Sequence, residues 1–377
     1  MNSSLSKIYA RVRESLTNIT FKRAAILLFR LVIGAVFLVD GFKIISDPVG
    51  RAIYTESILS DSFLSVLEPL SLVLSILTGA FKVSVGCCML LGTNILVASV
   101  YLIIFLFIEF FVLLFLPLST GWLLVRNLSL ILISVLIILL RKHSVKIYTR
   151  RTEWIIELYS FAFSIAFALY SFINLPIVDR TAMREGSSMK RVFLAVAMRS
   201  NIEVEQVNSV MNHVADEGYS FVLLSRRLTD ATTMLNEEVN NLYSYSQKHN
   251  YPFVCLTGEE TTDDEIREYV IESKGAEYPI LRFNKSLIDK VARSNPEFLI
   301  LKDGNVVRKF SAYKVPKLDS ELSDDLYGHE SESYTPRTLA LCVLAYFIPL
   351  LLLLVYDYLI ELIKWLLKKI MMKTKKI

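Results

Sequence analysis

The sequence predicts a multi-pass α-helical membrane bundle that carries one folded α/β domain on the non-cytoplasmic side of the membrane. The first observation is that 53% of the 377 residues are hydrophobic, above the usual share for a soluble protein, and that many of them gather in six long runs. The second is that Lys and Arg cluster beside these runs in a consistent pattern. The third is that the segment 177–336 is charged, has no long apolar run, and alternates short strand and helix patterns.

Four of the six apolar runs reach the length that a helix needs to cross a bilayer, about 20 residues, and the first and fourth are shorter. The predicted spans are Ala24–Val39, Leu70–Leu91, Ile95–Leu116, Leu128–Leu140, Trp154–Leu175 and Leu339–Leu362. The second and third spans are separated only by Gly92-Thr93-Asn94. Such a short turn predicts that these two helices are antiparallel neighbours.

The orientation follows from three basic clusters, because Lys and Arg near span ends stay in the cytoplasm. One cluster precedes the first span and contains Lys7, Arg11, Arg13, Lys22 and Arg23. A second fills the loop between the fourth and fifth spans and contains Arg141, Lys142, Lys146, Arg150 and Arg151. A third follows the last span and contains Lys364, Lys368, Lys369, Lys373, Lys375 and Lys376. Six spans with both termini in the cytoplasm satisfy all three. The sequence therefore predicts a cell inner membrane protein in contact with the lipid bilayer, with residues 177–336 in the periplasm.

The same reasoning divides the chain into six parts. They are a cytoplasmic segment 1–23, a helical membrane domain 24–176 with about five spans, a periplasmic domain 177–314, a polar tether 315–337, a last span 338–363 and a basic cytoplasmic tail 364–377. Asp47-Pro48 and Glu68-Pro69 bracket the first external loop and predict helix boundaries.

The periplasmic segment reads as β-α-β-α-β-α-β-β, which is typical of an α/β sheet with a final antiparallel hairpin. The predicted strands are Phe221–Leu224, Phe253–Leu256, Tyr278–Phe283, Phe298–Leu301 and Val306–Phe310, and the predicted helices are Asp230–His249, Thr262–Ser273 and Ser286–Arg293. Ala231 and Met234 belong to the apolar face predicted for the first of these helices. Asp303-Gly304 predicts the turn of the closing hairpin.

Cysteine and histidine usage argues against metal and thiol chemistry. The four cysteines, Cys87, Cys88, Cys255 and Cys342, form no CxxC motif, and we expect them to be small buried residues. The four histidines are scattered without ligand spacing, so no metal site and no cofactor are predicted. The basic clusters lack the pattern of a nucleic-acid interface, and no nucleic-acid partner is expected.

The strand order and closing hairpin resemble the thioredoxin fold, and Asn295-Pro296 before the strand Phe298–Leu301 stands where that fold has its cis-proline. The run from Arg293 to Gly304 is similar to the thioredoxin-like domain of a Bacteroidetes group of DoxX-family membrane proteins. The opening of the chain agrees, in Arg30–Phe37, Gly41-Phe42-Lys43 and Asp47–Gly50, and so does Leu175–Asp179 after the fifth span. The resemblance implies a DoxX-like bundle with a thioredoxin-like domain.

Three departures concern the chemistry that this resemblance implies. The thioredoxin cysteines would follow the first buried strand, where this chain has Ser225-Arg226-Arg227-Leu228-Thr229 and therefore no nucleophile for thiol–disulfide exchange. Relatives often carry a Cys-Gly-Cys-Phe-Gly motif before the fourth span, and the loop 118–127 has no cysteine. A carboxylate is also expected near Gly86 in the second span, where this chain has Lys82.

Charged residues within the spans are functional candidates because burying a charge in lipid is costly. They are Arg30, Asp40, Lys43, Lys82 and Glu109. Lys82 and Glu109 lie about three to four helical turns from the tight turn that joins their helices, so they should sit at similar depth and form an ion pair. Pairing of Arg30 with Glu109 is the alternative. Either pair would stabilise helix packing or belong to a site for an ion or ligand. Arg126 and Asn127 are interpreted as interfacial anchors of the fourth span.

The sequence leaves three functions open, and whether the protein is an enzyme stays uncertain, with the missing CxxC motif against it. The first is a binding or scaffolding role in the cell envelope, with an envelope protein or peptide partner held by strand addition in a groove. The groove residues would be Ser225, Arg226, Arg227, Thr229, Asn295 and Pro296. The second is a membrane oxidoreductase component linked to quinone or to envelope thiols, as the wider family implies. The third is a small-solute or ion transporter.

Overall fold

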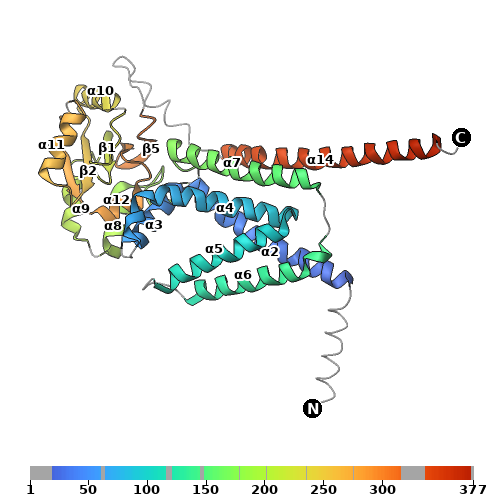
Figure 1. Cartoon of the computed structure of the whole chain (residues 1–377). Helices are drawn as coiled ribbons and strands as arrows, with labels where there is room; N and C mark the ends of the chain where they lie inside the picture. The colour runs from blue at the N-terminus through green and yellow to red at the C-terminus, as the bar shows by residue number, and fades with distance from the viewer. Residues whose placement is uncertain are drawn as a thin grey trace, which may run out of the picture. The chain divides into compact units, whose positions relative to one another are not determined.

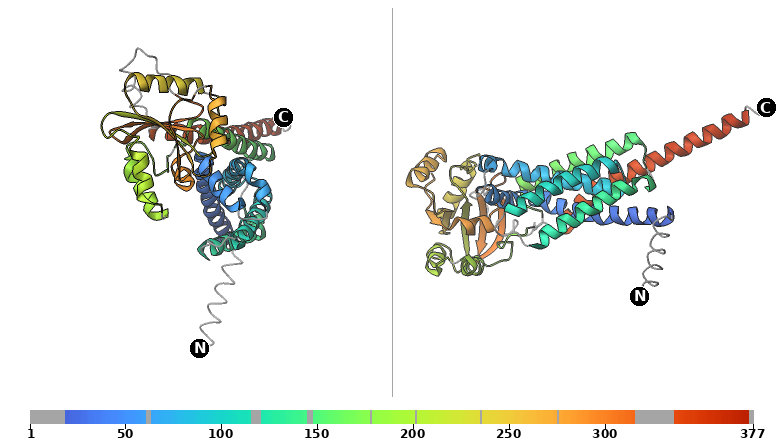
Figure 2. Two further views of the ribbon diagram at one scale, coloured as in Figure 1. Left: turned by 90° about the vertical axis from the view of Figure 1, so that its left-hand side faces the viewer. Right: turned by 60° about the horizontal axis from the view of Figure 1, so that its bottom comes forward.

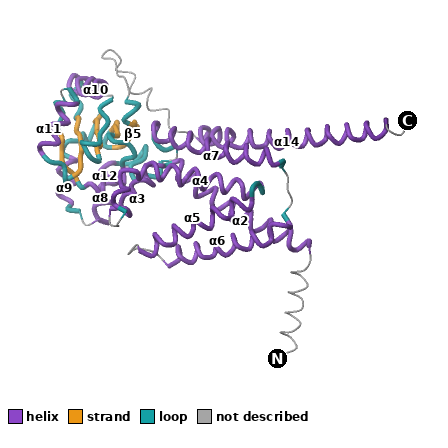
Figure 3. Tube along the Cα trace, in the orientation of Figure 1, coloured by secondary structure: helices purple, strands orange, loops and turns teal. Residues whose placement is uncertain are grey.

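The computed structural model describes residues 19–60, 64–115, 121–144, 148–177, 179–200, 202–234, 236–274, 276–315 and 336–374. These form two compact units, each described separately below. The helical unit lies within Met1–Ile45, Ile76–Ala166 and Leu341–Ile377, and the sheet unit lies within Ser46–Ser75 and Phe167–Ala340. Figure 1 labels the elements, and Figure 3 distinguishes the helices from the strands. The predicted tether falls almost wholly outside the described residues.

Within the described residues, six helices are long and apolar enough to cross a membrane, in agreement with the predicted number of spans. The helices that carry them are α2 (Ile19–Ser46), α4 (Ser71–Leu91), α5 (Ile95–Phe115), α6 (Gly121–Leu140), α7 (Arg150–Asn174) and α14 (Pro336–Thr374). The three-residue 3-10 helix η2 (Arg141–His143) follows α6. Between α4 and α5 the chain turns at Gly92 and Asn94, both with positive φ, as the predicted tight turn requires.

The predicted start of the fourth span at Leu128 is wrong, because α6 begins at Gly121. Arg126 and Asn127, the predicted interfacial anchors, lie in the second turn of this helix, and Asn127 is fully buried. Arg126 lies within 4 Å of Asp40 and Glu109, a contact that a hydropathy window does not detect.

Helices α2 and α4 pack closely through four glycines at matching seven-residue spacing. Gly34 and Gly41 lie on α2, and Gly79 and Gly86 lie on α4. A Cβ added at Gly86 would lie 2.6 Å from the backbone N of Leu38, so only glycine permits this approach. Small residues are the usual means by which membrane helices come into backbone contact.

The last span is tied to α7 by buried polar contacts. Asp357 is almost fully buried, and its Oδ1 accepts a hydrogen bond from Thr152 Oγ1 at 2.7 Å while its Oδ2 accepts one from Thr149 N at 2.9 Å. Further along the same pair of helices, Ser160 Oγ and Tyr346 Oη lie 2.5 Å apart. These contacts hold α14 against α7 although a long stretch of chain separates the two helices.

The sheet unit is built on a five-stranded mixed sheet in the order β3-β2-β1-β4-β5. Strand β2 pairs parallel with both β1 and β3, and β4 pairs antiparallel with both β1 and β5. The strands are β1 (Tyr219–Ser225), β2 (Phe253–Gly258), β3 (Ile280–Phe283), β4 (Glu297–Lys302) and β5 (Asn305–Ser311). The helices are α8 (Met189–Ser200), α9 (Val204–Met211), α10 (Asn236–Lys248), α11 (Asp263–Glu272) and α12 (Lys285–Val291). The element order from β1 to β5 is therefore the predicted one.

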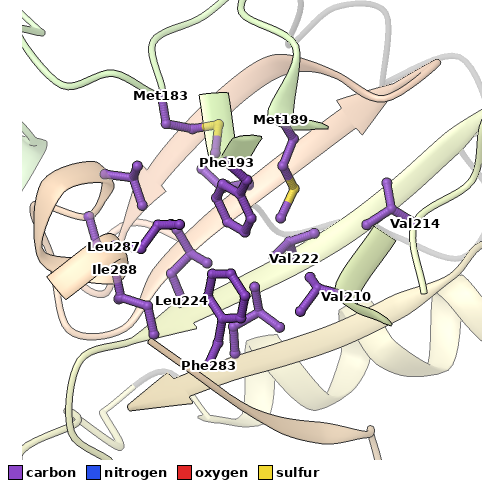
Figure 4. Packing of buried hydrophobic residues seen from close by; sticks show 14 of the residues in the cluster. Met183, Met189, Phe193, Val210, Val214, Val222, Leu224, Phe283, Leu287 and Ile288 are labelled. Atoms are coloured by element: carbon purple, nitrogen blue, oxygen red, sulfur yellow. The ribbon is translucent and has the colours of Figure 1, made fainter. Parts of the chain in front are cut away.

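Helices cover both faces of this sheet (Figure 2). Alternate residues of β1 point to opposite faces, so Val222 and Leu224 pack with α8, α9 and α12, whereas Phe221 and Leu223 pack with α10 and α11. Figure 4 shows the first of these cores, where Phe193 of α8 stacks on Phe283 of β3 with ring centroids 5.2 Å apart. Burial on both faces explains the continuous apolar runs of the central strands.

Local predictions in this unit had mixed outcomes. Thr262 caps α11 with a complete capping box, and Asp303 and Gly304 form the hairpin turn with positive φ, as expected. Helix α10 begins at Asn236 instead of Asp230, so Met234 lies in a loop with 73% of its surface exposed. This loop is held out of the helix partly because Thr232 N bonds to Asn295 O at 3.1 Å. Helices α8 and α9 were not predicted.

The segment between α2 and α4 is folded as part of the sheet unit. It contains α3 (Pro48–Ser60) and a 3-10 helix η1 (Ser65–Leu70). Asp47 caps α3, since its Oδ1 accepts a hydrogen bond from Gly50 N at 2.9 Å, which confirms the helix boundary predicted at Asp47-Pro48. Proline suits the first helical position, where its missing N–H is not needed. Glu68-Pro69 falls inside η1, just before α4 begins.

Candidate functional site

The loop after β1 and the segment before β4 are joined through one side chain, that of Asn295. Its Oδ1 accepts hydrogen bonds from Ser225 Oγ at 2.9 Å and from the backbone N of Arg226 at 3.0 Å. Its Nδ2 donates to the backbone O of Arg227 at 2.9 Å. The Asn295–Pro296 peptide bond is cis, and Pro296 is buried. Five of the six predicted groove residues therefore meet, and Thr229 lies exposed further along the same loop.

Arg226 is firmly held between two carboxylates. Its Nη2 lies 2.8 Å from Glu56 Oε2, and its Nε lies 2.8 Å from Asp289 Oδ1. Asp289 belongs to α12 and Glu56 to α3, so the arginine connects the body of the sheet unit to the segment between α2 and α4. The side chain is 17% exposed, and charge-assisted bonds of this length are the strong kind.

Arg227 is surrounded by four carboxylates at longer distances. Its Nη2 lies 3.5 Å from Glu56 Oε1 and 3.5 Å from Glu68 Oε1. Asp230 and Glu260 lie 3.7 Å and 3.9 Å away from the same guanidinium. Partial burial lowers the pKa of Arg227, but Glu56, Asp230 and Glu68 together outweigh burial and raise it. The guanidinium is therefore charged at any physiological pH.

A third arginine, Arg293, ties the N-terminus of α3 to the segment before Pro296. Arg293 Nε lies 3.1 Å from Asp47 Oδ2, and both side chains are nearly buried. The same arginine donates from Nη1 to the backbone oxygens of Asp289 and Ala292 at 3.0 Å and 2.8 Å. Asp47 thus serves two purposes, since it caps α3 and also pairs with Arg293.

A buried ion pair lies at the start of β4. Glu297 is fully buried, and its Oε1 lies 2.8 Å from Lys309 Nζ of β5. Lys309 also lies 3.1 Å from Asp179 Oδ2. Burial lowers the pKa of Lys309, but the carboxylates of Glu297 and Asp179 outweigh burial and raise it. The other oxygen of Glu297 accepts a hydrogen bond from Arg293 N at 2.5 Å, so this pair supports the segment that carries Asn295.

In the helical unit, four of the five predicted charged residues form one chain of ion pairs. Lys82 Nζ lies 2.7 Å from Glu109 Oε1, the predicted pair, and Lys82 also lies 5.2 Å and 5.8 Å from the rings of Phe105 and Phe37. Arg126 continues the chain. Its nitrogens lie 3.9 Å from Glu109 and 3.7 Å from Asp40, which lies 3.9 Å from Lys43.

Arg30, the fifth candidate, lies apart from this chain. Its Nε and Nη2 donate to the backbone oxygens of Met89 and Leu90 at 3.0 Å and 3.3 Å, and its Nη1 donates to Ser144 Oγ at 2.9 Å. These oxygens are at the C-terminus of α4, where a positive charge also complements the helix dipole. Arg30 therefore caps α4, and its predicted alternative of pairing with Glu109 is not the arrangement found.

The residues that sequence reasoning missed are Glu56, Glu68 and Asp289 of the sheet unit and Arg126 of the helical unit. Glu68 was interpreted only as part of a helix boundary, and Glu56 was not singled out. No local pattern marks them, because their partners are far away in the sequence. The one available signal was the density of acidic residues in a short loop opposite a pair of adjacent arginines.

None of the cysteines lies at these sites. Cys87, Cys88 and Cys255 are buried, as expected, and Cys342 is partly exposed. Cys255 lies within β2, and burial raises the pKa of its thiol to about 12, which keeps it protonated at neutral pH. Within the described part of the chain, no group of three or more His, Cys, Asp or Glu side chains could hold a metal ion. Comparison of the chain with protein-family profiles, with curated proteins and with solved structures gave no match.

Proposed function

We propose that this protein is a membrane-anchored binding or scaffolding protein of the cell envelope, with a thioredoxin-like sheet unit that does not exchange thiols. The helix and strand order and the cis bond before β4 support the thioredoxin-like assignment. The proposal includes a DoxX-like bundle, which the resemblance of the opening motifs of the chain supports. The basic clusters support the orientation with the sheet unit in the periplasm.

One observation carries the binding role, which is that two adjacent arginines, and no cysteine, follow β1. Arg226 and Arg227, called the arginine pair below, stand where a redox thioredoxin has its cysteines. They contact carboxylates of α3, η1 and α12. Two guanidinium groups side by side recognise carboxylates well, because each offers a planar fork of donors.

The mode of binding differs from strand addition at Asn295. The backbone oxygen of Asn295 already accepts a hydrogen bond from Thr232, and its side chain is engaged with residues 225–227. A peptide strand would have to break these contacts. Side-chain recognition by the arginine pair needs no such loss. Met234 is an exposed apolar side chain on the same loop and can add contact area at the rim.

Site-specific photo-crosslinking in cells tests this proposal, with a photoreactive amino acid at position 234 or 198. Met234 and Met198 are both 73% exposed in the sheet unit, but Met198 lies on α8, across the sheet from α10. We expect discrete protein adducts at 234 that disappear in R226Q/R227Q, and none at 198. Equal adducts at both positions, or none at 234, would overturn the binding role. Catalysis of insulin reduction by the purified protein would overturn the non-redox assignment.

The ion-pair chain in the helical unit favours a second candidate, a membrane redox component that binds a quinone. Asp40, Arg126, Glu109 and Lys82 supply polar groups, and Phe37 and Phe105 lie beside Lys82. Absorbance and mass spectrometry of the detergent-purified protein test this candidate. A stoichiometric quinone that is lost in K82M/E109L would favour it over the scaffold role, and its absence from the wild-type protein would count against it.

A further inference from the structure

Glu56 bridges the two arginines of the pair with its two carboxylate oxygens. Oε2 lies 2.8 Å from Arg226 and Oε1 lies 3.5 Å from Arg227. Glu68 adds a second carboxylate to Arg227 at 3.5 Å. Both acidic residues come from the loop between the first two spans, through α3 and η1. This loop therefore supplies the arginine pair with carboxylates, the same groups that an acidic peptide would present.

The two arginines are held with different strength. All four carboxylates around Arg227 lie at 3.5 Å or more, and this arginine is 40% exposed. Solvent and salt screen such pairs, so they are weak and exchange readily. Arg226 has two contacts of 2.8 Å and is 17% exposed. Exchange of ligands should therefore begin at Arg227 and Glu68 and then reach Glu56.

Displacement of the Glu56 and Glu68 side chains, with the Asp47–Arg293 pair kept, would leave no buried charge at the site without a partner. When Glu56 departs, Arg226 keeps Asp289 at 2.8 Å. Arg227 keeps Asp230 and Glu260, and Lys285 keeps Glu260 at 2.9 Å. Three cations then face three carboxylates at the site. The high cost of removing one member of a buried ion pair is thus avoided, and a ligand with two carboxylates restores what the loop supplied.

We infer that Glu56 and Glu68 are internal occupants of the arginine pair, and that its external ligand is an acidic peptide segment that displaces them. This inference rests on the proposed binding function and names the ligand class of that same site. While the loop occupies the pair, only the fraction of molecules with the loop released can bind, so the apparent affinity for the peptide is reduced by that fraction.

The test uses the full chain in nanodiscs of phosphatidylcholine and a fluorescein-labelled hexaglutamate peptide, with hexaglutamine as the probe control. Fluorescence anisotropy measures binding. We expect E56Q/E68Q to bind hexaglutamate at least tenfold more tightly than the wild type. Adding R226Q/R227Q to this variant should abolish binding. Hexaglutamine should bind neither protein.

The matched control is D230N/E260Q, which removes the same amount of negative charge around Arg227 but leaves the loop intact. We expect the affinity of this control for hexaglutamate to rise less than threefold. An equal gain in both double variants would mean general electrostatic attraction and would overturn the inference. No gain in E56Q/E68Q would mean that the loop is a permanent part of the fold, which also overturns it. The single variant E68Q, which alters only the exposed contact with Arg227, should give an intermediate gain even if E56Q/E68Q does not fold.

Anionic lipid is the competing source of negative charge. Repeating the measurement in phosphatidylglycerol nanodiscs should leave hexaglutamate binding by E56Q/E68Q within threefold of its value in phosphatidylcholine. Loss of that binding would assign the pair to lipid headgroups instead of a peptide. The proposed function can survive this failure, because adducts at position 234 that depend on Arg226 and Arg227 would still show a binding role.

Discussion

Glu56 Oε2 lies 2.8 Å from Arg226 Nη2, although the two residues are 170 positions apart in the sequence. The contact joins the loop between the first two spans to the loop after β1. It places a carboxylate of the first loop on the arginine pair, and the proposed displacement by an acidic peptide rests on this contact. Other contacts of the same loop make separate predictions.

Gly50 is confined by the contact between Asp47 and Arg293. A Cβ at this position would lie 2.8 Å from Asp47 Cγ and 2.9 Å from Arg293 Nε. We expect G50A to disturb the cap of α3 and to lower the free energy of unfolding of the sheet unit by about 1–3 kcal/mol. The rate of Cys255 alkylation by iodoacetamide in increasing urea measures this, because Cys255 reacts only when the sheet opens. G121A is the control, since its added Cβ meets no atom within 4 Å, and equal effects of the two would contradict the prediction.

The Glu297–Lys309 pair is buried, so removal of one partner leaves an isolated charge. We expect K309M to lower the free energy of unfolding by about 3–5 kcal/mol and E297L/K309M to recover much of that loss. Urea unfolding followed by Cys255 alkylation measures both. K302M is the control for the loss of a lysine side chain, because it removes the lysine at the end of the neighbouring strand β4. A double variant no more stable than K309M would show that packing, and not the unpaired charge, sets the cost.

The same lysine makes the sheet unit sensitive to alkaline pH. Its pKa is raised in the folded state, above the usual 10.5, so the folded protein holds the proton more tightly than the unfolded chain does. This contribution to stability is complete below the unfolded pKa and is lost as pH rises through the folded value. We expect the unfolding midpoint of the wild type to fall above pH 10.5 more steeply than that of E297L/K309M. Parallel falls in the two proteins would contradict this.

For the Lys82–Glu109 pair of the bundle, removal of one partner should likewise cost more stability than removal of both. K82M leaves Glu109 with only the longer contact to Arg126, and E109L leaves Lys82 without this carboxylate, whereas K82M/E109L removes both charges of the pair. We expect both single variants to lower the thermal unfolding midpoint in detergent and the double variant to lie closer to the wild type. K364M is the control, because Lys364 is 63% exposed and its pair with Glu361 is a surface contact. If K82M alone has no effect, the pair does not stabilise helix packing.

The predicted topology is tested by labelling with a membrane-impermeant maleimide in spheroplasts. Ile271 is 77% exposed on α11, and Arg150 is exposed at the start of α7. We expect I271C to be labelled in intact spheroplasts and R150C only after permeabilisation. The wild type, whose cysteines are mostly buried, provides the background. The reverse pattern would overturn the orientation on which the proposed envelope role depends.

Much of the fold could be predicted because the signals are local. Hydropathy over about 20 residues reveals a span, and apolar spacing reveals a strand or a helix. Local spacing also predicted the pairing of Lys82 with Glu109, because a three-residue turn sets the depth of both residues. The hairpin at Asp303-Gly304 and the cap at Thr262 are local in the same sense.

What the sequence alone determined was therefore the six spans, the order of strands and helices after residue 218, and the missing thiols after β1. Only the tertiary structure decided that Glu56 and Glu68 fill the arginine pair, that Arg126 joins the ion-pair chain, and that Arg30 caps α4. Ion pairs of this kind depend on where two distant segments meet. Charge carries no directional signal along the chain, so any of several acidic residues could have been the partner until packing brought one within hydrogen-bond distance.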